Sequence, residues 1–196
     1  MRFLFSIYLI LNILFGAVAF ADDFDDANQA YDAGDFAKAH KLYRMSAKDG
    51  DELAQFNLGL MYLQGKGVSQ DYDEAVKWFR LSADQGYAKA QYNMGVAYDQ
   101  GMGVKKDEKE SFRWNKLAAE SGHAGAQFQL AYDYAIGDVV PHDLLRAYMW
   151  FYFAAEQNED NAADNRDYAI EQMTDAQYAK AKSMVSACIA QDYQGC

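Results

Sequence analysis

The segment at residues 64–71, QGKGVSQD, is the stretch whose composition most resembles a ligand-binding loop. Two glycines flank Lys66, and the backbone amides of such a loop can surround a phosphate group. Related segments recur as QGMGVKKD at residues 100–107 and as IGDVVPHD at residues 136–143. Met102 and Asp138 stand where the lysine stood, and an aspartate would repel a phosphate. We therefore interpret the loop as structural, and we expect Lys66 to have no fixed role.

Histidines and serines give no catalytic pattern. His40, His123 and His142 stand in different segments, and none belongs to an HExxH motif or to a pair with metal-ligand spacing. The chain has no GxSxG motif of the kind that presents a nucleophilic serine. We therefore expect no catalytic residue, no metal site and no cofactor, and we interpret the protein as a non-enzyme.

Residues 1–21 have the layout of a secretory signal peptide. Arg2 precedes an apolar run, and the run ends in the small-residue pattern AFA before an acidic segment. We expect cleavage after Ala21 and a periplasmic or secreted location. The alternative is an uncleaved membrane anchor, because the apolar run at residues 3–20 is only just long enough to span a bilayer.

Cys188 and Cys196 are the only cysteines, and both lie close to the C-terminus. An even pair in an exported protein favours a disulfide. Closing so short a loop would stabilise the fold by about 2–3 kcal/mol in the chain-entropy model. The alternative is two free thiols on a frayed tail.

The charge balance bears on the partners. The chain has 18 Lys and Arg residues against 29 Asp and Glu residues, which gives a net charge of −11 at pH 7. Nucleic acids and anionic membranes need clustered basic residues, and the sequence has no basic block. We therefore expect no nucleic-acid partner and no stable membrane insertion after signal cleavage.

A period of 36 residues organises the chain, since three copies align without a gap at residues 52–87, 88–123 and 124–159. The copies share Gln55, Gln91 and Gln127, Tyr62, Tyr98 and Tyr134, and Trp78, Trp114 and Trp150. Small and apolar residues within each copy follow helical spacing, which predicts a helix, a loop and a second helix. One such pair cannot bury its own apolar face, so the pairs must stack.

The ends of the chain depart from this period. Residues 22–51 are a degenerate, tetratricopeptide-like unit with a shorter loop between its helices. Residues 160–196 predict two further capping helices, and Thr174 is the expected N-cap of the second one. The sequence therefore predicts an all-α fold, a right-handed α-solenoid of stacked helix-loop-helix repeats.

Several loop residues have predicted structural roles. A glycine just past the first helix is expected to adopt the left-handed conformation in each copy: Gly65, Gly101 and Gly137. Gly67 and Gly103 need no positive φ, because the third copy has Val139 there. An aspartate is expected to cap the second helix of each pair: Asp35, Asp71, Asp107 and Asp143. Glu74 and Glu110 would complete capping boxes.

The shared positions form the pattern AxxxLGxxYxxGxGVxxDxxxAxxWxxxAAxxG, which resembles the Sel-1-like repeat, a subclass of tetratricopeptide-like α-solenoid. The resemblance covers residues 24–159, and the segment NRDYAIEQMTDAQYAKAK is similar to the capping helices that often end bacterial members. The third copy departs most from the pattern, with Ala131 and Val139 in place of glycines. The resemblance implies an adaptor or scaffold that binds an unidentified protein or peptide.

By analogy with tetratricopeptide geometry, the first helix of each pair lines a concave face. That face would present aromatic and apolar residues beside amides: Phe56, Asn57, Leu60, Tyr92, Asn93, Val96, Phe128, Gln129 and Tyr132. An aromatic stripe flanked by amides suits an extended peptide or a partner helix. The alternative is that most of these aromatic residues belong to the core between repeats.

Two other functions stay open. Some exported relatives, which have a cysteine pair in each repeat, are described as penicillin-binding or β-lactamase-like. A serine β-lactamase needs an SxxK nucleophile, but no serine here has a lysine three residues on, and the cysteine pairs are missing. The third function is that of a structural envelope protein that assembles with itself.

Overall fold

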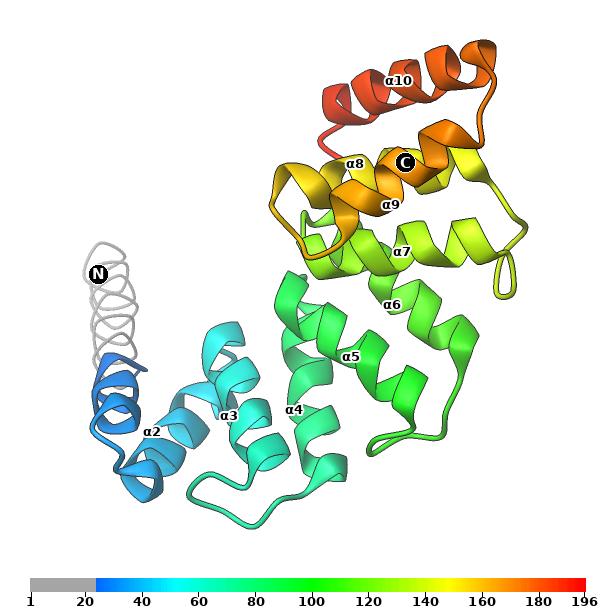
Figure 1. Cartoon of the computed structure of the whole chain (residues 1–196). Coiled ribbons are helices and arrows are strands. Elements are labelled where there is room, and N and C mark those ends of the chain that lie inside the picture. The colour runs from blue at the N-terminus through cyan, green and yellow to red at the C-terminus, as the bar shows by residue number, and fades with distance from the viewer. Residues whose placement is uncertain (1–23) are drawn as a thin grey trace, which may run out of the picture. The chain divides into compact units, whose positions relative to one another are not determined.

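The computed structural model describes residues 24–196, which form helices joined by loops and contain no strand. The predicted signal peptide at residues 1–21 lies outside the described residues. After a helix over residues 24–32 follow α2 (Phe36–Lys48), α3 (Glu52–Gln64), α4 (Tyr72–Asp84), α5 (Ala88–Gln100), α6 (Glu108–Glu120), α7 (Ala124–Ile136), α8 (Leu144–Glu156), α9 (Ala162–Glu171) and α10 (Asp175–Ala190) (Figure 1). The predicted all-α fold of helix-loop-helix repeats is confirmed.

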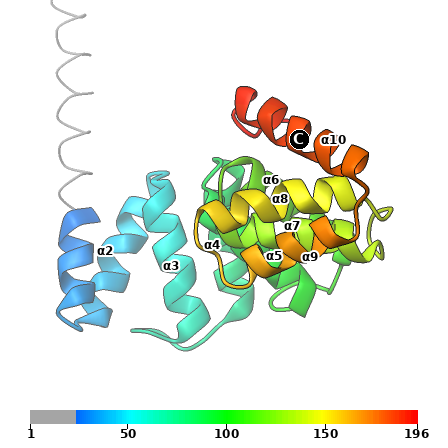
Figure 2. The same ribbon diagram turned by 45° about the horizontal axis from the view of Figure 1, so that its top comes forward.

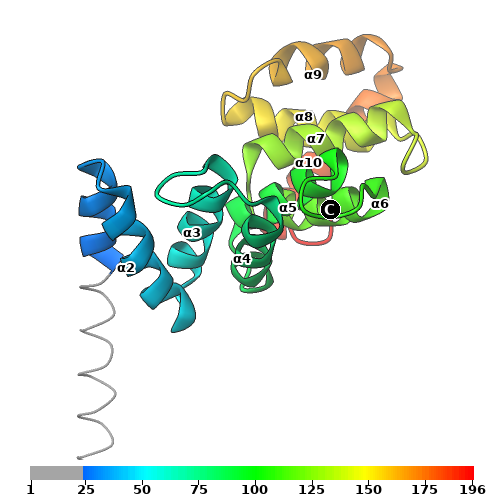
Figure 3. The same ribbon diagram turned by 90° about the horizontal axis from the view of Figure 1, so that it is seen from below.

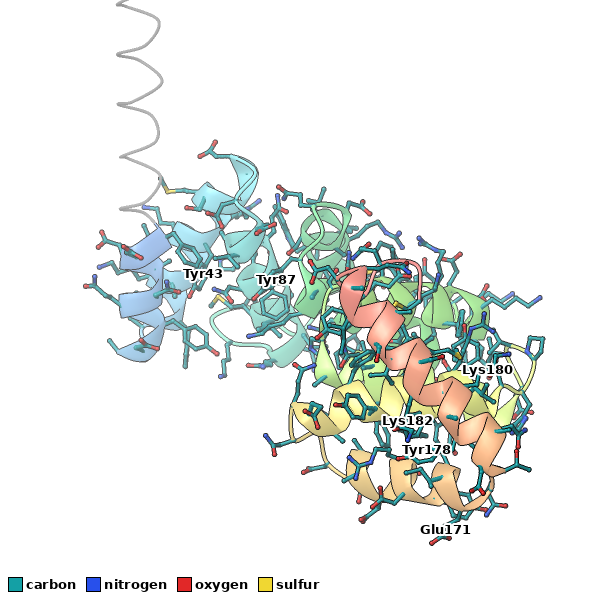
Figure 4. The ribbon with its side chains drawn as sticks, turned by 90° about the horizontal axis from the view of Figure 1, so that it is seen from above. Tyr43, Tyr87, Glu171, Tyr178, Lys180 and Lys182 are labelled. Atoms are coloured by element: carbon teal, nitrogen blue, oxygen red, sulfur yellow. A yellow bond between two sulfur atoms is a disulfide. The ribbon has the colours of Figure 1, made fainter. Side chains whose placement is uncertain are left out.

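The described chain divides into two compact units, one ending at Leu81 and the other beginning at Ser82. In the first unit, the helix over residues 24–32 packs with α2 and α3 around the buried side chains of Tyr43, Leu58 and Met61. Tyr43 also donates a hydrogen bond of 2.6 Å from its hydroxyl to Asn28 Oδ1, and Figure 4 shows it among these helices. A core of large side chains therefore joins the degenerate first unit to the first full repeat.

The core of the second unit is centred on α8. Trp150 is fully buried there, and buried Leu130 of α7 and Val185 of α10 belong to the same cluster. Figures 2 and 3 show α8 lying beside α7 and α9. On α10, Tyr178 and Lys182 lie on one side and Lys180 on the other (Figure 4), with Lys182 Nζ 4.4 Å from the centroid of the Tyr178 ring.

The aspartates cap the second helices, as predicted. Asp107 Oδ1 accepts hydrogen bonds from the backbone N–H groups of Lys109 and Glu110, and Asp143 Oδ1 does the same at the start of α8. Asp35 and Asp71 accept the equivalent bonds from Lys38 N and Glu74 N. These side chains satisfy N–H groups that have no partner within the helix.

The predicted capping boxes at Glu74 and Glu110 are wrong. Glu74 Oε1 accepts from Lys77 Nζ at 2.5 Å, and Glu110 Oε2 accepts from Arg113 Nε at 3.0 Å. The N–H groups of Asp71 and Asp107, which a capping box would use, donate instead to the carbonyls of Tyr62 and Tyr98 at 3.0 and 2.9 Å. Each glutamate then pairs with the cation three residues on, on the same helix face. A capping box does form at the start of α10, where Thr174, the predicted N-cap, exchanges hydrogen bonds with Gln177.

Glycine conformations in the repeat loops confirm the prediction for the first glycine, whereas the prediction for the second glycine is wrong. Gly65, Gly101 and Gly137 have φ values of 68°, 70° and 83° and end α3, α5 and α7. Gly67 and Gly103 also have positive φ, at 72° and 65°. Val139 has no positive φ, so the third loop follows a different backbone path from the first two.

The C-terminal tail is fixed in the second unit. Cys188 of α10 forms the predicted disulfide with Cys196. Beside it, Gln194 Nε2 donates to the backbone carbonyl of Glu120 at 3.0 Å, and the N–H of Gly195 donates to Glu120 Oε1 at 3.2 Å. The tail therefore closes over the end of α6.

Candidate binding surface

Buried glutamines fix the first helix of each repeat against the preceding one. Gln91 Nε2 donates to the carbonyl of Ala83 at 3.3 Å, and Gln127 Nε2 donates to the carbonyl of Ala119 at 3.2 Å. In the first unit Gln55 makes the same bond to Ala47. Each bond satisfies a carbonyl in the last turn of a helix, where no partner within the helix exists. The shared glutamines of the repeat are therefore structural.

In the first unit, the predicted groove residues Phe56, Asn57 and Leu60 are all partly buried. The centroid of the Phe56 ring lies 5.8 Å from that of Phe79 on α4. This distance is typical of aromatic pairs that pack within a core. Phe56 is therefore partly committed to holding α3 against α4.

In the second unit, two predicted aromatics also pack against their own scaffold. Tyr92 stacks on His123 with ring centroids 4.5 Å apart, and Phe128 lies 5.5 Å from Phe151. His123 Nδ1 in turn accepts from Ala126 N at 3.2 Å and caps α7. Burial, and then the charge of Lys89, lower the pKa of His123, which keeps this nitrogen free to accept.

Tyr132, the last predicted groove residue on α7, is different because it is 48% exposed. Ile136, one turn further along the same helix, is 50% exposed. Asn93 and Val96 on α5 and Gln129 on α7 are partly buried. Tyr132 and Ile136 therefore form an exposed apolar ridge on α7, which separates two hollows.

The first hollow, which we call the acidic pocket, has a volume of about 200 Å³. Its charged and polar lining consists of Asp99, Glu108, Ser111, Gln129, Asp133 and Asp138. These residues come from α5, from α6, from α7 and from the loop after α7. Gln129 Nε2 donates to Asp133 Oδ1 at 3.1 Å. Burial, with smaller effects from Asp99 and Glu108, raises the pKa of Asp133 to about 6.

A smaller hollow adjoins the acidic pocket and shares Asp99, Ser111 and Gln129 with it. Asn115 of α6 lies in its wall, is only 2% exposed, and donates from Nδ2 to Ser111 Oγ at 3.3 Å. The side-chain oxygen of Asn115 accepts no hydrogen bond from the described residues. Gly95 permits this arrangement, because a Cβ at that position would overlap the Asn115 amide.

The second hollow, which we call the apolar pocket, has a volume of about 510 Å³ and lies on the other side of the ridge. Tyr132 and Ile136 line it together with Ala135, Leu144, Phe151, Tyr168 and Ala169, and its polar lining residues are His142, Asn165 and Gln172. Tyr168 of α9 is 63% exposed. Large exposed apolar side chains beside a hollow are typical of surfaces that bind another molecule.

The predicted groove residues fall into two groups. Tyr92, Val96, Gln129 and Tyr132 line one or more of these hollows, whereas the other five line none of the three. The carboxylates were missed by sequence reasoning, although the repeat contains a signal for two of them. Asp133 aligns with Met61 and Ala97, and Asp99 aligns with Leu63 and Ala135. A carboxylate at an otherwise apolar repeat position marks this site.

Neither a metal centre nor a membrane span is found among residues 24–196. No group of three or more His, Cys, Asp or Glu side chains there is placed to hold a metal ion. No helix in that range is both long and apolar enough to cross a bilayer.

The chain is built from repeated helical hairpins, and small residues are buried at the same positions in each repeat. These features define the class of α-solenoid proteins. The Sel1 repeat model matches the chain at residues 29–51, 53–87, 88–123 and 124–159. The chain therefore belongs to the Sel1 repeat family, whose repeats typically mediate protein–protein interaction. No curated protein matches the chain significantly.

Two solved structures resemble the chain. The first is c5321, a protective antigen present in uropathogenic Escherichia coli strains that displays an SLR fold, at 34% identity and a TM-score of 0.69. The second is a Sel1 repeat protein from Oxalobacter formigenes, at 33% identity and a TM-score of 0.67. The matches cover 80% and 78% of this chain but only 34% and 46% of those proteins. This chain therefore spans about a third and just under half of their lengths.

Proposed function

We propose that this chain is an exported adaptor that binds a protein or peptide over the ridge formed by Tyr132 and Ile136. The observation that carries this proposal is the exposure of about half of each side chain, at 48% and 50%, between two hollows. Burying these apolar surfaces against a partner is favourable, at about 25 cal/mol per Å². Aromatic residues placed at the centre of such a surface are frequent energetic anchors of protein interfaces.

Among the groove residues predicted from the sequence, we assign partner contact to Tyr92, Val96, Gln129 and Tyr132, because these line the hollows. Phe56 and Phe128 are instead assigned to the scaffold, since their rings pack against Phe79 and Phe151 and, unlike Tyr92, they line none of the three hollows. The proposal thus narrows the predicted stripe to the second unit.

Export of the protein is part of the same proposal. The disulfide between Cys188 and Cys196 supports an oxidising compartment, since such bonds persist mainly outside the cytosol. The predicted signal peptide at residues 1–21 adds to this, and the periplasm or the external medium is the proposed location. Fractionation of cells that express the full chain, followed by mass measurement of its N-terminus, tests both statements.

The adaptor function is tested by crosslinking in the cells that export the protein. Replacing Tyr132 and Ile136 together by Ala removes the ridge, and we expect the crosslinked partner to be lost while the thermal midpoint stays nearly unchanged. Ile189→Ala is the matched control, because this side chain is 56% exposed but lies on α10, away from both pockets. Capture of the same partner by both variants would contradict the proposal.

The two alternative functions give different results. A binding protein without catalytic activity does not turn over a chromogenic β-lactam, whereas a β-lactamase-like protein does. Self-assembly would appear in light scattering as an average mass that rises with protein concentration. The variant without Tyr132 and Ile136 would then have a lower mass than the parent at the same concentration. We expect neither turnover nor such a rise.

A further inference from the structure

The acidic pocket favours a positively charged occupant. Asp99, Glu108, Asp133 and Asp138 line it. Lys106 is the basic side chain paired at its rim, with Nζ 3.3 Å from Glu108 Oε1, and both side chains are more than half exposed. Such an exposed pair is weak. Because burial disfavours the charged form of Asp133, a neighbouring cation would relieve that cost.

The geometry favours an organic cation over a metal ion. The carboxylates come from three helices and a loop, and no group of acidic side chains in residues 24–196 converges as metal ligands do. An ammonium group has three donors and a guanidinium group has five, and both can reach separated acceptors. A lysine or arginine side chain therefore matches the pocket better than a divalent ion.

Asn115 supplies a second, independent indication. Its oxygen is buried against Gly95 and accepts no hydrogen bond from the described residues. Asn115 lines the smaller hollow, which shares Asp99, Ser111 and Gln129 with the acidic pocket. A buried acceptor without a donor costs free energy that an incoming N–H group can recover.

The apolar pocket limits the partner further. It adjoins the acidic pocket across Tyr132 and Ile136, and its volume of about 510 Å³ is enough for a large side chain. Phe151 and Leu144 line it, so an apolar group is favoured there. The two pockets together match two neighbouring side chains of opposite character.

We infer that the second unit binds a segment of a partner protein in which a Lys or Arg side chain enters the acidic pocket and a nearby large apolar side chain enters the apolar pocket. The net charge of −11 adds long-range attraction for such a basic segment. This inference rests on the proposed adaptor function, and it names the chemistry of the partner.

A library of short immobilised peptides with all amino acids at each position tests this inference on the purified full chain. Peptides that bind should be enriched in Lys or Arg together with a large apolar residue nearby. Binding should weaken when the salt concentration rises from about 0.15 M to about 0.5 M, because salt screens exposed charges. Bound peptides without basic enrichment, or no binding at all, would overturn the inference.

A charge-removing variant gives the matched control. Replacing Asp99 and Asp133 together by Asn keeps the side-chain size, and we expect the affinity for the selected peptides to fall about tenfold or more. Asp164 and Asp175, exposed acidic residues of α9 and α10 that line neither pocket, are replaced by Asn in the control. Equal affinity of the two double variants would overturn the inference.

The two proposals fail separately. One result is that removal of Tyr132 and Ile136 abolishes the crosslinked partner, while the selected peptides show no basic preference. That result rejects the cationic partner and keeps the adaptor function. Survival of the crosslinked partner in that variant rejects the adaptor function at this surface.

Discussion

Lys66 Nζ donates a hydrogen bond of 2.7 Å to the hydroxyl oxygen of Tyr31, which lies in the first described helix. The same ammonium group lies 5.0 Å from the centroid of the Tyr31 ring and 5.4 Å from that of Phe36. The lysine between the two loop glycines was expected to have no fixed role. The lysine links the first full repeat to the degenerate unit before it. The later copies have no equivalent lysine, because Met102 and Asp138 stand at the aligned positions.

Replacing Lys66 by Met should therefore weaken the first unit. The variant loses the hydrogen bond and both cation–π contacts, so we expect the free energy of unfolding to fall by about 0.5–2 kcal/mol. Chemical denaturation measures the change. Lys41→Met, at an exposed position of α2, serves as the control and should stay within about 0.5 kcal/mol of the parent. Equal effects would show that the contacts of Lys66 contribute nothing.

Gly67→Ala should destabilise the first unit more than Gly34→Ala. Both glycines have positive φ, at 72° and 79°, which costs an alanine about 1–2 kcal/mol. A Cβ at Gly67 would also overlap the carbonyl oxygen of Phe36, whereas a Cβ at Gly34 meets nothing within 4 Å. Thermal melting of the two variants measures the additional steric cost. A larger shift for Gly34→Ala is the outcome that contradicts this reading.

Gln127→Leu should lower the free energy of unfolding by about 1–3 kcal/mol. The side chain is fully buried, donates to the carbonyl of Ala119, and accepts from Gln157 Nε2 at 2.9 Å. Leucine removes both bonds: the Ala119 carbonyl keeps only backbone donors such as Gly122 N at 2.9 Å, and Gln157 Nε2 loses this acceptor in a partly buried site. Urea denaturation provides the measurement, and Gln100→Leu, at the exposed end of α5, is the control. No loss at Gln127 would exclude a stabilising role for the repeated glutamine.

Reduction of the disulfide should release the C-terminal tail. The cross-link closes a loop with a sequence separation of 8 residues, and its loss should cost about 2–3 kcal/mol in the chain-entropy model. We expect faster proteolysis after residue 190 and a lower thermal midpoint in the presence of reductant. Cys196→Ser should show both effects without reductant and should not respond further to it. An unchanged cleavage rate would mean that the contacts with Glu120 hold the tail alone.

Asp133→Asn should stabilise the protein at neutral pH. The folded-state pKa of Asp133, raised to about 6 chiefly by burial, lies above the unfolded value of about 4. Between these values the folded state binds more protons, so the contribution of this residue to stability falls as the pH rises from about 4 through about 6. With allowance for partial exposure, we expect a gain of about 1 kcal/mol at pH 7 and little change at pH 4.

Thermal melting across this pH range, compared with exposed Asp164→Asn, measures the effect of Asp133. Destabilisation at pH 7 would show that the carboxylate is favourable in its pocket. The same melt on the variant in which both Asp99 and Asp133 are replaced shows whether unfolding explains any loss of its peptide binding.

Features that depend on neighbouring residues could be predicted from the sequence. The period of the repeat gave the helix pairs, because buried residues at helical spacing recur wherever the pairs stack. The caps at Asp107 and Asp143, the left-handed Gly65 and the cap at Thr174 each depend on hydrogen bonds within a few residues, so local composition determines them.

The remaining features depend on distances that no repeat pattern specifies. Gly67 has positive φ in the loop after α3, which closely approaches Phe36 at the start of α2. The aligned Val139 led to the prediction that this position needs no positive φ. Glu110 closes no capping box, because the N–H of Asp107 donates to the carbonyl of Tyr98 in the preceding helix at 2.9 Å, and Glu110 accepts from Arg113 instead.

The residues of the candidate site also fall into a group that the sequence predicts and a group that only the tertiary structure brings together. The sequence alone placed Tyr132 and Gln129 on one helix face, since a helix fixes the direction of its own side chains. Only the tertiary structure brought Asp99 and Glu108 to Asp133, because these residues lie on three helices whose packing determines their separation. The sequence by itself therefore determined the family and the scaffold, and the packing of α5, α6 and α7 decided where its negative charge gathers.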